Sequence, residues 1–227
     1  MEKRKVGIII LVIVVLSATV FGIYLANHEC ENEDPLTPSR RDLLEVAKPI
    51  IYLYPEEEQE VKVTLGNPEN LTCTYPKYED SWNVIAKPNG DLVDIKTGRN
   101  LYALYWEGIE SNAEVKEDGF VIKGEDSIKF LEEKLAILGL NEREAEEFIV
   151  YWLPKLEANK YNYIRFETRE EIEEDMPLII EPVPSTVIRI VMNFKGLDEF
   201  MEVEEQVLTT PVRNGFTVVE WGGTEIK

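Results

Sequence analysis

The sequence predicts an α+β domain, mainly an antiparallel β-sheet or sandwich with a helical hairpin inserted in it, preceded by one transmembrane helix. Three observations predict this arrangement. Residues 6–25 contain no charged side chain. Short runs rich in β-branched and aromatic residues, several of them alternating apolar with polar positions, fill most of residues 48–227. Two runs with helical periodicity interrupt these strands between residues 126 and 156.

The charge-free stretch Val6–Leu25 is long enough to cross a bilayer, because a helix of this length spans about 30 Å. Basic residues at positions 3–5 precede it, and an acidic segment, residues 29–34, follows it. Since basic flanks favour the cytoplasmic side, we expect residues 1–5 in the cytoplasm and the remaining chain outside the membrane. The alternative is a cleaved signal peptide, whose apolar core normally has only about 7–15 residues.

A polar segment with two prolines, residues 26–47, is predicted to tether the domain to this anchor. Cys30 in the tether and Cys73 in the domain would both lie outside the membrane, where a disulfide is permitted. A Cys30–Cys73 bond, an intermolecular Cys30 pair and two free thiols all remain open, since connectivity cannot be read from sequence. Asn70 begins an Asn-x-Thr sequon, so glycosylation at this residue is a further expectation.

The formal net charge of −20 restricts the classes of partner. A strongly acidic surface repels the phosphates of nucleic acids, so we expect no nucleic-acid binding. Such a surface suits cations and cationic partners, and it also keeps a protein soluble.

The first half of the domain reads as strands separated by turns. The expected strands are residues 48–55, 60–65, 71–75, 81–87 and 101–107, followed by a hairpin over 114–123 that turns at 117–119. Apolar residues alternate along two of these strands, as expected for a half-buried sheet: Trp82, Val84 and Ala86 in one, and Tyr102, Leu104 and Trp106 in the other.

Two helices are expected next. The first spans residues 126–138, presents Ile128, Leu131, Leu135 and Leu138 on one face, and ends at Gly139. The second begins at Asn141, where Glu144 completes a capping-box pattern. Pro154 lies inside this second helix and should kink or shorten it. Because the link between the helices is short, we expect a hairpin that packs on one face of the sheet.

Strands then resume. The expected elements are a strand over 162–167, a short acidic helix over 168–175 capped by Thr168 and Glu171, and strands over 178–181, 186–194, 202–208 and 216–221. Strands on both sides of a helical hairpin favour one α+β domain. Two subdomains that divide near Gly124 are the alternative.

Six phrases of this sequence occur in a characteristic combination. They are KPIIYLYP at 48–55, TYPKY at 74–78, WNVIAKPNGDL at 82–92, YWEG at 105–108, YWLP at 151–154 and GFTVVEWGG at 215–223. The combination resembles a family of uncharacterised microbial proteins that are exported or membrane-anchored. This resemblance covers nearly the whole domain and implies a shared exported fold. It implies no activity, so it supplies no catalytic residues.

Several chemistries are excluded by the residues that the domain has. The chain has a single histidine, His28, which lies in the tether. The domain therefore lacks the histidine that Ser-His-Asp catalysis, Cys-His catalysis and histidine-ligated zinc require. Cys73 alone cannot build a structural zinc site. The sequence contains no phosphate-binding Gly-rich loop of the nucleotide-binding type and no dinucleotide fingerprint. We therefore expect no cofactor and no metal.

Two carboxylates remain as candidate catalytic residues. Glu107 and Glu220 each end a strand, beside a tryptophan and before a glycine, and two acids suffice for glycoside hydrolysis. If Glu220 faces inward, its carboxylate needs a partner, for which Arg165, Arg189 and Arg213 are the candidates. The alternative is that the tryptophans fill the core and the acids form buried ion pairs.

Aromatic residues supply candidate ligand-binding positions. Trp82, Trp106 and Trp221, together with Arg189, would form a platform for sugars if their side chains were exposed. At alternating positions such aromatic residues more often fill a sheet core.

These observations favour a non-enzymatic, membrane-tethered extracytoplasmic domain that binds an envelope protein or a glycan. The alternative function is a carboxylate-dependent glycan hydrolase that uses Glu107 and Glu220. The two hypotheses differ in one geometric requirement. The carboxylates of a hydrolase must line one open pocket, within about 10 Å of each other.

Overall fold

A computed structural model describes residues 44–110 and 113–227 of the chain. The predicted anchor, residues 6–25, lies outside the described residues. None of the helices described is both long and apolar enough to cross a bilayer. Residues 44–47, expected as the end of the tether, already belong to the first strand.

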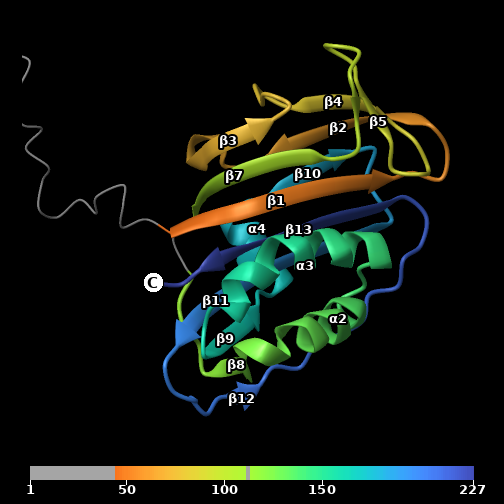
Figure 1. Cartoon of the computed structure of the whole chain (residues 1–227). Helices are drawn as coiled ribbons and strands as arrows, with labels where there is room; N and C mark the ends of the chain where they lie inside the picture. The colour runs from red at the N-terminus through yellow and green to blue at the C-terminus, as the bar shows by residue number, and fades with distance from the viewer. Residues whose placement is uncertain (1–43, 111–112) are drawn as a thin grey trace, which may run out of the picture. The chain divides into compact units, whose positions relative to one another are not determined.

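The described residues form an eight-stranded sheet and a five-stranded sheet (Figure 1). The large sheet has the order β12-β8-β9-β11-β13-β1-β7-β3, with β12 Glu204–Glu205, β8 Asp118–Lys123, β9 Tyr161–Phe166, β11 Thr186–Leu197, β13 Thr217–Glu225, β1 Leu44–Tyr54, β7 Leu104–Glu110 and β3 Leu71–Tyr75. The small sheet has the order β10-β2-β4-β5-β6, with β10 Leu178–Glu181, β2 Gln59–Leu65, β4 Trp82–Ala86, β5 Leu92–Asp94 and β6 Asn100–Leu101. The helices are α2 Ser127–Ile137, α3 Glu142–Glu157 and α4 Arg169–Asp175, and 3-10 turns cover Pro68–Asn70 and Gly124–Asp126.

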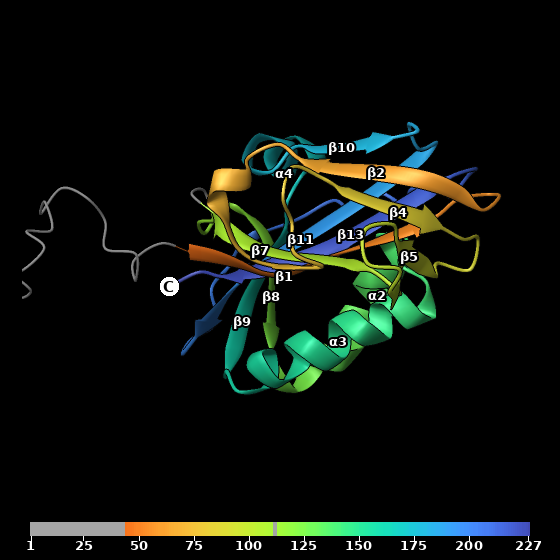
Figure 2. The same ribbon diagram turned by 90° about the horizontal axis from the view of Figure 1, so that it is seen from above.

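The layers confirm an α+β fold with a sandwich and a helical hairpin. Helices α2 and α3 cover one face of the large sheet, and the small sheet lies against the other (Figure 2). Pairing is antiparallel in the described chain except between β11 and β13 and between β12 and β8. Strands β8 and β9, on either side of the helical hairpin in sequence, are direct neighbours in the large sheet.

Strand β1 shows why both faces of the large sheet must be apolar. Ile50 and Tyr52 pack against the helical hairpin, whereas Ile51 and Leu53 pack between the two sheets. Successive side chains of a strand point to opposite faces, so a strand covered on both sides reads as a continuous apolar run. This explains the sequence KPIIYLYP at 48–55.

The helix ends follow the expected signals. The side chain of Asn141 accepts a hydrogen bond from the backbone N–H of Glu144, whose carboxylate accepts one from the N–H of Asn141 in return. Gly139 ends the preceding helix region with a φ of 91°, which favours glycine.

Pro154 does not end α3, which continues to Glu157. Ile128, expected on the buried face of α2, is exposed; Phe130 takes a buried place beside Leu131 and Leu135.

Three expected elements, two strands and a hairpin, differ from the structure. The strand over 101–107 is broken between β6 and β7, so Tyr102 leaves the face of Leu104 and Trp106 and its ring lies 6.4 Å from that of Tyr52. The prediction of a hairpin over 114–123 is wrong, because residues 118–123 form one strand, β8, between β9 and β12. The strand over 202–208 reduces to the two residues of β12.

Candidate functional site

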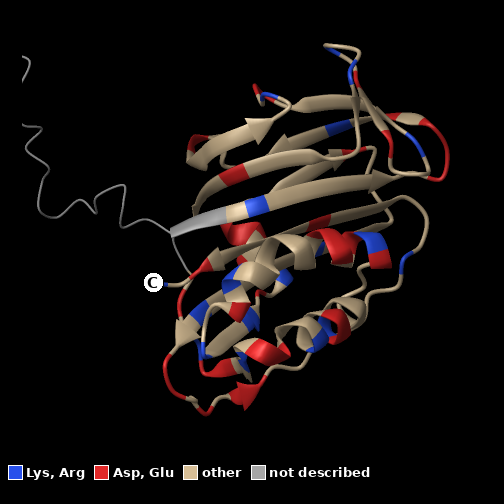
Figure 3. Cartoon of the chain, viewed as in Figure 1, with Lys and Arg blue, Asp and Glu red and all other residues tan. Residues whose placement is uncertain are grey.

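A polar hollow of about 450 Å³ lies on the face of the large sheet opposite the helical hairpin. Here α4 packs against β11, and its Glu171 reaches Arg165 of β9. Acidic residues are numerous over the whole described chain (Figure 3), and the described lining of the hollow carries five of them: Glu114, Glu167, Glu171, Glu174 and Asp175. The described lining is completed by Lys116, Arg165, Asn193 and Ala113. We call the space that these nine residues line the hollow.

Strand alternation brings the polar residues to this face. On β9, Ile164 and Phe166 pack against the helical hairpin, so Arg165 points to the opposite side. On β11, Met192 and Phe194 do the same, which directs Asn193 to the side of Arg165. These two polar residues are register partners across the two strands.

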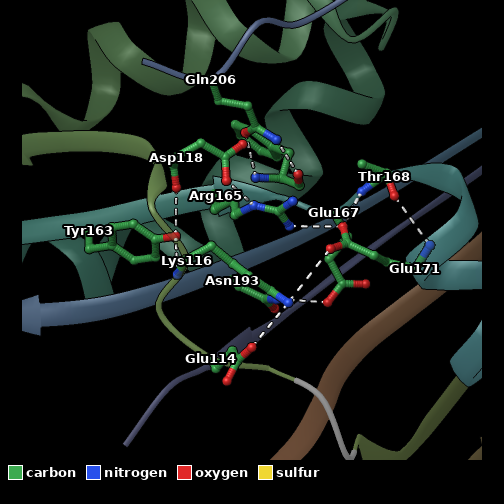
Figure 4. A network of polar contacts seen from close by, with 11 residues as sticks. Glu114, Lys116, Asp118, Tyr163, Arg165, Glu167, Thr168, Glu171, Asn193 and Gln206 are labelled. Atoms are coloured by element: carbon green, nitrogen blue, oxygen red, sulfur yellow. Dashed lines mark hydrogen bonds and ion pairs between the residues drawn. The ribbon is translucent and has the colours of Figure 1, made fainter. Parts of the chain in front are cut away.

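Arg165 organises the deep part of the hollow (Figure 4). Its Nε donates a hydrogen bond to Asp118 Oδ1 at 2.9 Å, and its Nη1 donates one to Glu171 Oε2 at 2.9 Å. Burial by itself lowers the pKa of Arg165, but the hydrogen bonds to these two carboxylates raise it above its ordinary value. Burial likewise raises the pKa of Glu171, and the contacts with Arg165 and Thr168 outweigh it, so the net shift is downward. Both groups are therefore held in their charged forms.

The same glutamate also begins α4. Glu171 Oε2 accepts a hydrogen bond from the backbone N–H of Thr168 at 2.7 Å, which completes a capping box. On the neighbouring edge, the side-chain amide of Gln206 makes two hydrogen bonds to the backbone of Phe166, at 3.0 and 2.6 Å. The end of β9 and the start of α4 are thus fixed around Arg165.

Lys116 and Asn193 each contact carboxylates of the hollow (Figure 4). The Nζ of Lys116 lies 3.1 Å from Glu114 Oε1 and 4.0 Å from Glu171 Oε1. Asn193 is 4% exposed, and its Nδ2 donates to Glu167 Oε1 at 2.7 Å. Its Oδ1 is buried and accepts no hydrogen bond from any described residue. A buried acceptor without a donor is costly, and such groups are rare in folded proteins.

Glu220 belongs to a different arrangement, the sealed cluster of Glu220, Arg189 and Trp106. Trp106 Nε1 donates to Glu220 Oε1 at 2.8 Å, and Arg189 Nε donates to Glu220 Oε2 at 2.5 Å. Arg189 Nη1 also donates to the carbonyl of Met176 at 2.8 Å and lies 3.2 Å from Glu173 Oε1. The side chains of Arg189 and Glu220 are 1% and 2% exposed. Neither can meet a ligand from solvent.

The two candidate catalytic carboxylates lie on opposite faces of the large sheet. Trp106 points between the sheets to reach Glu220. Glu107 is the next residue on the same strand and points the other way, toward the side of the helical hairpin. There burial, and secondly the hydrogen bond from Tyr105 to Glu107, raise the pKa of the Tyr105 hydroxyl. Glu107 and Glu220 therefore do not line one pocket, as the hydrolase hypothesis requires.

The candidate ligand-binding tryptophans are buried. Trp82 and Trp106 fill the core between the sheets, and Trp221 fills the core beneath the helical hairpin, so they do not form an exposed sugar platform. Cys73 is exposed on β3 and forms no disulfide with any described residue. Cys30 lies outside the described residues, so the pairing of the two cysteines stays a prediction, as does glycosylation of Asn70.

The residues of the hollow come from three separate stretches of sequence, 113–116, 165–175 and residue 193, which is why sequence reasoning did not assemble them. One signal was present: Arg165 and Asn193 interrupt strongly apolar strands. Among the described residues, no group of three or more His, Cys, Asp or Glu side chains is placed to hold a metal ion. The five carboxylates of the hollow form a negatively charged wall.

Comparison with known proteins adds one similarity. No protein-family model matches the chain, and no solved structure matches it. A stretch of 64 residues, 27% of the chain, is 38% identical to a Butyrivibrio fibrisolvens protein described as "Uncharacterized protein in bglA 3'region". The match spans 65% of that protein's length, which is less than two thirds. Its description names no activity, so the similarity transfers none to this chain.

Proposed function

We propose that the chain is a single-pass, membrane-tethered binding domain whose C-terminal part lies outside the cell membrane and takes a polar ligand in the hollow. Residues 6–25 support the membrane assignment through their length and their flanking charges. The resemblance to exported microbial proteins agrees with this assignment.

The single observation that carries the binding role is the buried, unpaired Oδ1 of Asn193 beside an open polar hollow. Of the six described side chains with a buried polar atom that makes no hydrogen bond, Asn193 is the one that lines the hollow, so a ligand in the hollow can supply the missing donor. Small-ligand sites are usually concave and mostly apolar with a few fixed polar groups, whereas the lining of this hollow is polar except for Ala113, which suits a polar ligand. The pair Glu107 and Glu220 gives the glycan-hydrolase alternative no comparable support, since the two residues face opposite ways.

A blocking substitution tests the binding role. Glu174 is an exposed residue of α4 that lines the hollow, whereas Glu170 is an exposed residue of the same helix that does not line it. We expect ligands from a panel of small polar amines, acids and sugars to raise the melting temperature of the full-length chain and of Glu170→Trp. We expect the same ligands to leave Glu174→Trp unchanged. Equal shifts in both variants would refute the hollow as the binding site.

The exposed Cys73 tests the location. In a Cys30→Ser variant, a membrane-impermeant maleimide should label Cys73 on intact cells, because the domain lies outside. Labelling that occurs only after cell lysis would contradict the proposed orientation.

A further inference from the structure

We infer that the hollow binds an alkylammonium group, either of a free aliphatic amine or of a lysine side chain presented by a peptide. This inference rests on the proposed binding function and names its ligand class. Three features of the hollow carry it: its charge, the unpaired oxygen of Asn193 and the position of Lys116.

The charge of the hollow favours a cation. Five carboxylates in the described lining face two basic side chains, Lys116 and Arg165. Arg165 is already paired with Asp118 and Glu171, so its charge is not available to an incoming anion. Like charges that converge in a partly enclosed site raise the local concentration of ions of opposite sign. An anionic ligand would be repelled.

The side-chain oxygen of Asn193, Oδ1, lacks a hydrogen-bond donor. A carboxylate only accepts hydrogen bonds, so the amide nitrogen must be the atom that faces Glu167. This contact fixes the orientation of the amide and leaves Oδ1 as the unpaired acceptor. An ammonium group has three donors and no acceptor. One of its N–H groups can bind Asn193 Oδ1 while the others bind carboxylates of the wall.

Lys116 already places an alkylammonium in the hollow. Its Nζ lies 3.1 Å from Glu114, but it leaves Asn193 Oδ1 unpaired. The Lys116 side chain is 38% exposed and flexible, so a ligand ammonium can displace it toward solvent. Lys116 therefore acts as a built-in competitor of the ligand.

The test measures binding of two probes to the full-length chain in detergent by isothermal titration calorimetry. Cadaverine represents a free amine, and Nα-acetyl-lysine methylamide represents a lysine within a peptide. Lys116→Met removes the competing ammonium and should tighten the binding of at least one probe about tenfold. Lys123→Met is the matched control, because Lys123 Nζ also lies 3.1 Å from a carboxylate, that of Glu125, outside the hollow. This control should bind like the unsubstituted chain.

The outcomes separate this inference from the function on which it rests. Tighter binding of cadaverine or of the lysine derivative by Lys116→Met alone supports an alkylammonium ligand, and the preferred probe identifies its source. Equal affinities in Lys116→Met and Lys123→Met, or a preference of Lys116→Met for Ca²⁺ over both amines, would overturn it. If neither amine binds but Glu174→Trp still blocks the binding of a different ligand, the inference is wrong and the binding function stands. If Glu174→Trp blocks nothing, both are wrong.

Discussion

Two arginines on one face of the large sheet have opposite surroundings. Arg189 on β11 is 1% exposed in the sealed cluster, and its partner Glu220 is 2% exposed. Arg165 on β9 is 8% exposed, but its partners Asp118 and Glu171 are 39% and 33% exposed. Helix α4 supplies a glutamate to each arginine, Glu173 to Arg189 and Glu171 to Arg165. Similar chemistry is thus enclosed in one place and open to solvent in the other.

The difference separates a structural role from a binding role. Charges that are removed from water must be paired, and removing one partner leaves the other uncompensated. The sealed cluster should therefore govern stability and be insensitive to ligands. Exposed pairs contribute little to stability, so Lys116 and Glu114 can exchange their contacts for those of a ligand. The following predictions test this contrast.

The largest expected effect is on Glu220. Glu220→Ala leaves the buried guanidinium of Arg189 without its carboxylate and should lower the free energy of unfolding by about 3–5 kcal/mol. Urea denaturation followed by tryptophan fluorescence measures this loss. Replacing both partners, as Arg189→Met with Glu220→Leu, should cost far less than the single change. A loss below about 1 kcal/mol in Glu220→Ala would show that the cluster is not sealed.

Glu171 should have an intermediate, pH-dependent effect. Glu171→Gln removes the charge that faces Arg165 but keeps an acceptor for the helix cap, so we expect a loss of about 1 kcal/mol at pH 7, reduced by partial exposure. The folded-state pKa of Glu171 lies below its unfolded value. Its contribution is therefore present above the unfolded pKa of about 4.3 and is lost as pH falls through the folded pKa. Urea denaturation of both proteins between pH 7 and pH 3 should show the difference disappearing at the acidic end. A constant difference would refute this assignment.

The smallest effect on stability should come from Lys116. Lys116→Met should change the free energy of unfolding by no more than about 0.5 kcal/mol, because the Lys116–Glu114 pair is largely exposed. Added salt should remove even this difference. The same substitution should change amine affinity clearly, so stability and binding separate at this residue. A loss of several kcal/mol would place Lys116 with the structural charges.

The elements with local signals could be predicted from sequence. Asn141 and Glu144 mark the start of α3 because the capping box lies within four residues. Val61, Val63 and Leu65 mark the buried face of β2 by alternation alone. Glu117-Asp118-Gly119 was misread because its residues favour turns, whereas pairing of β8 with β9 and β12 makes residues 118–119 strand.

Non-local partners could not be predicted. Three arginines were candidates for Glu220, and the choice of Arg189 depends on the parallel register of β11 with β13, which sets Arg189 opposite Glu220. The hollow depends on the segment before β8, on β9, on α4 and on β11 together. No periodicity within one segment of sequence carries that information.

The side-chain amide of Asn193 gives the most direct test of the ligand site. Cadaverine titrated into the ¹⁵N-labelled full-length chain should shift the NMR signals of the Asn193 side-chain amide, because its oxygen gains a donor. Asn162 is the control: its Nδ2 donates to the carbonyl of Leu156 and its Oδ1 accepts from Asn159, so its signals should stay in place. A saturable shift of Asn193 alone is the predicted result. Unchanged Asn193 signals at saturating cadaverine would contradict the account.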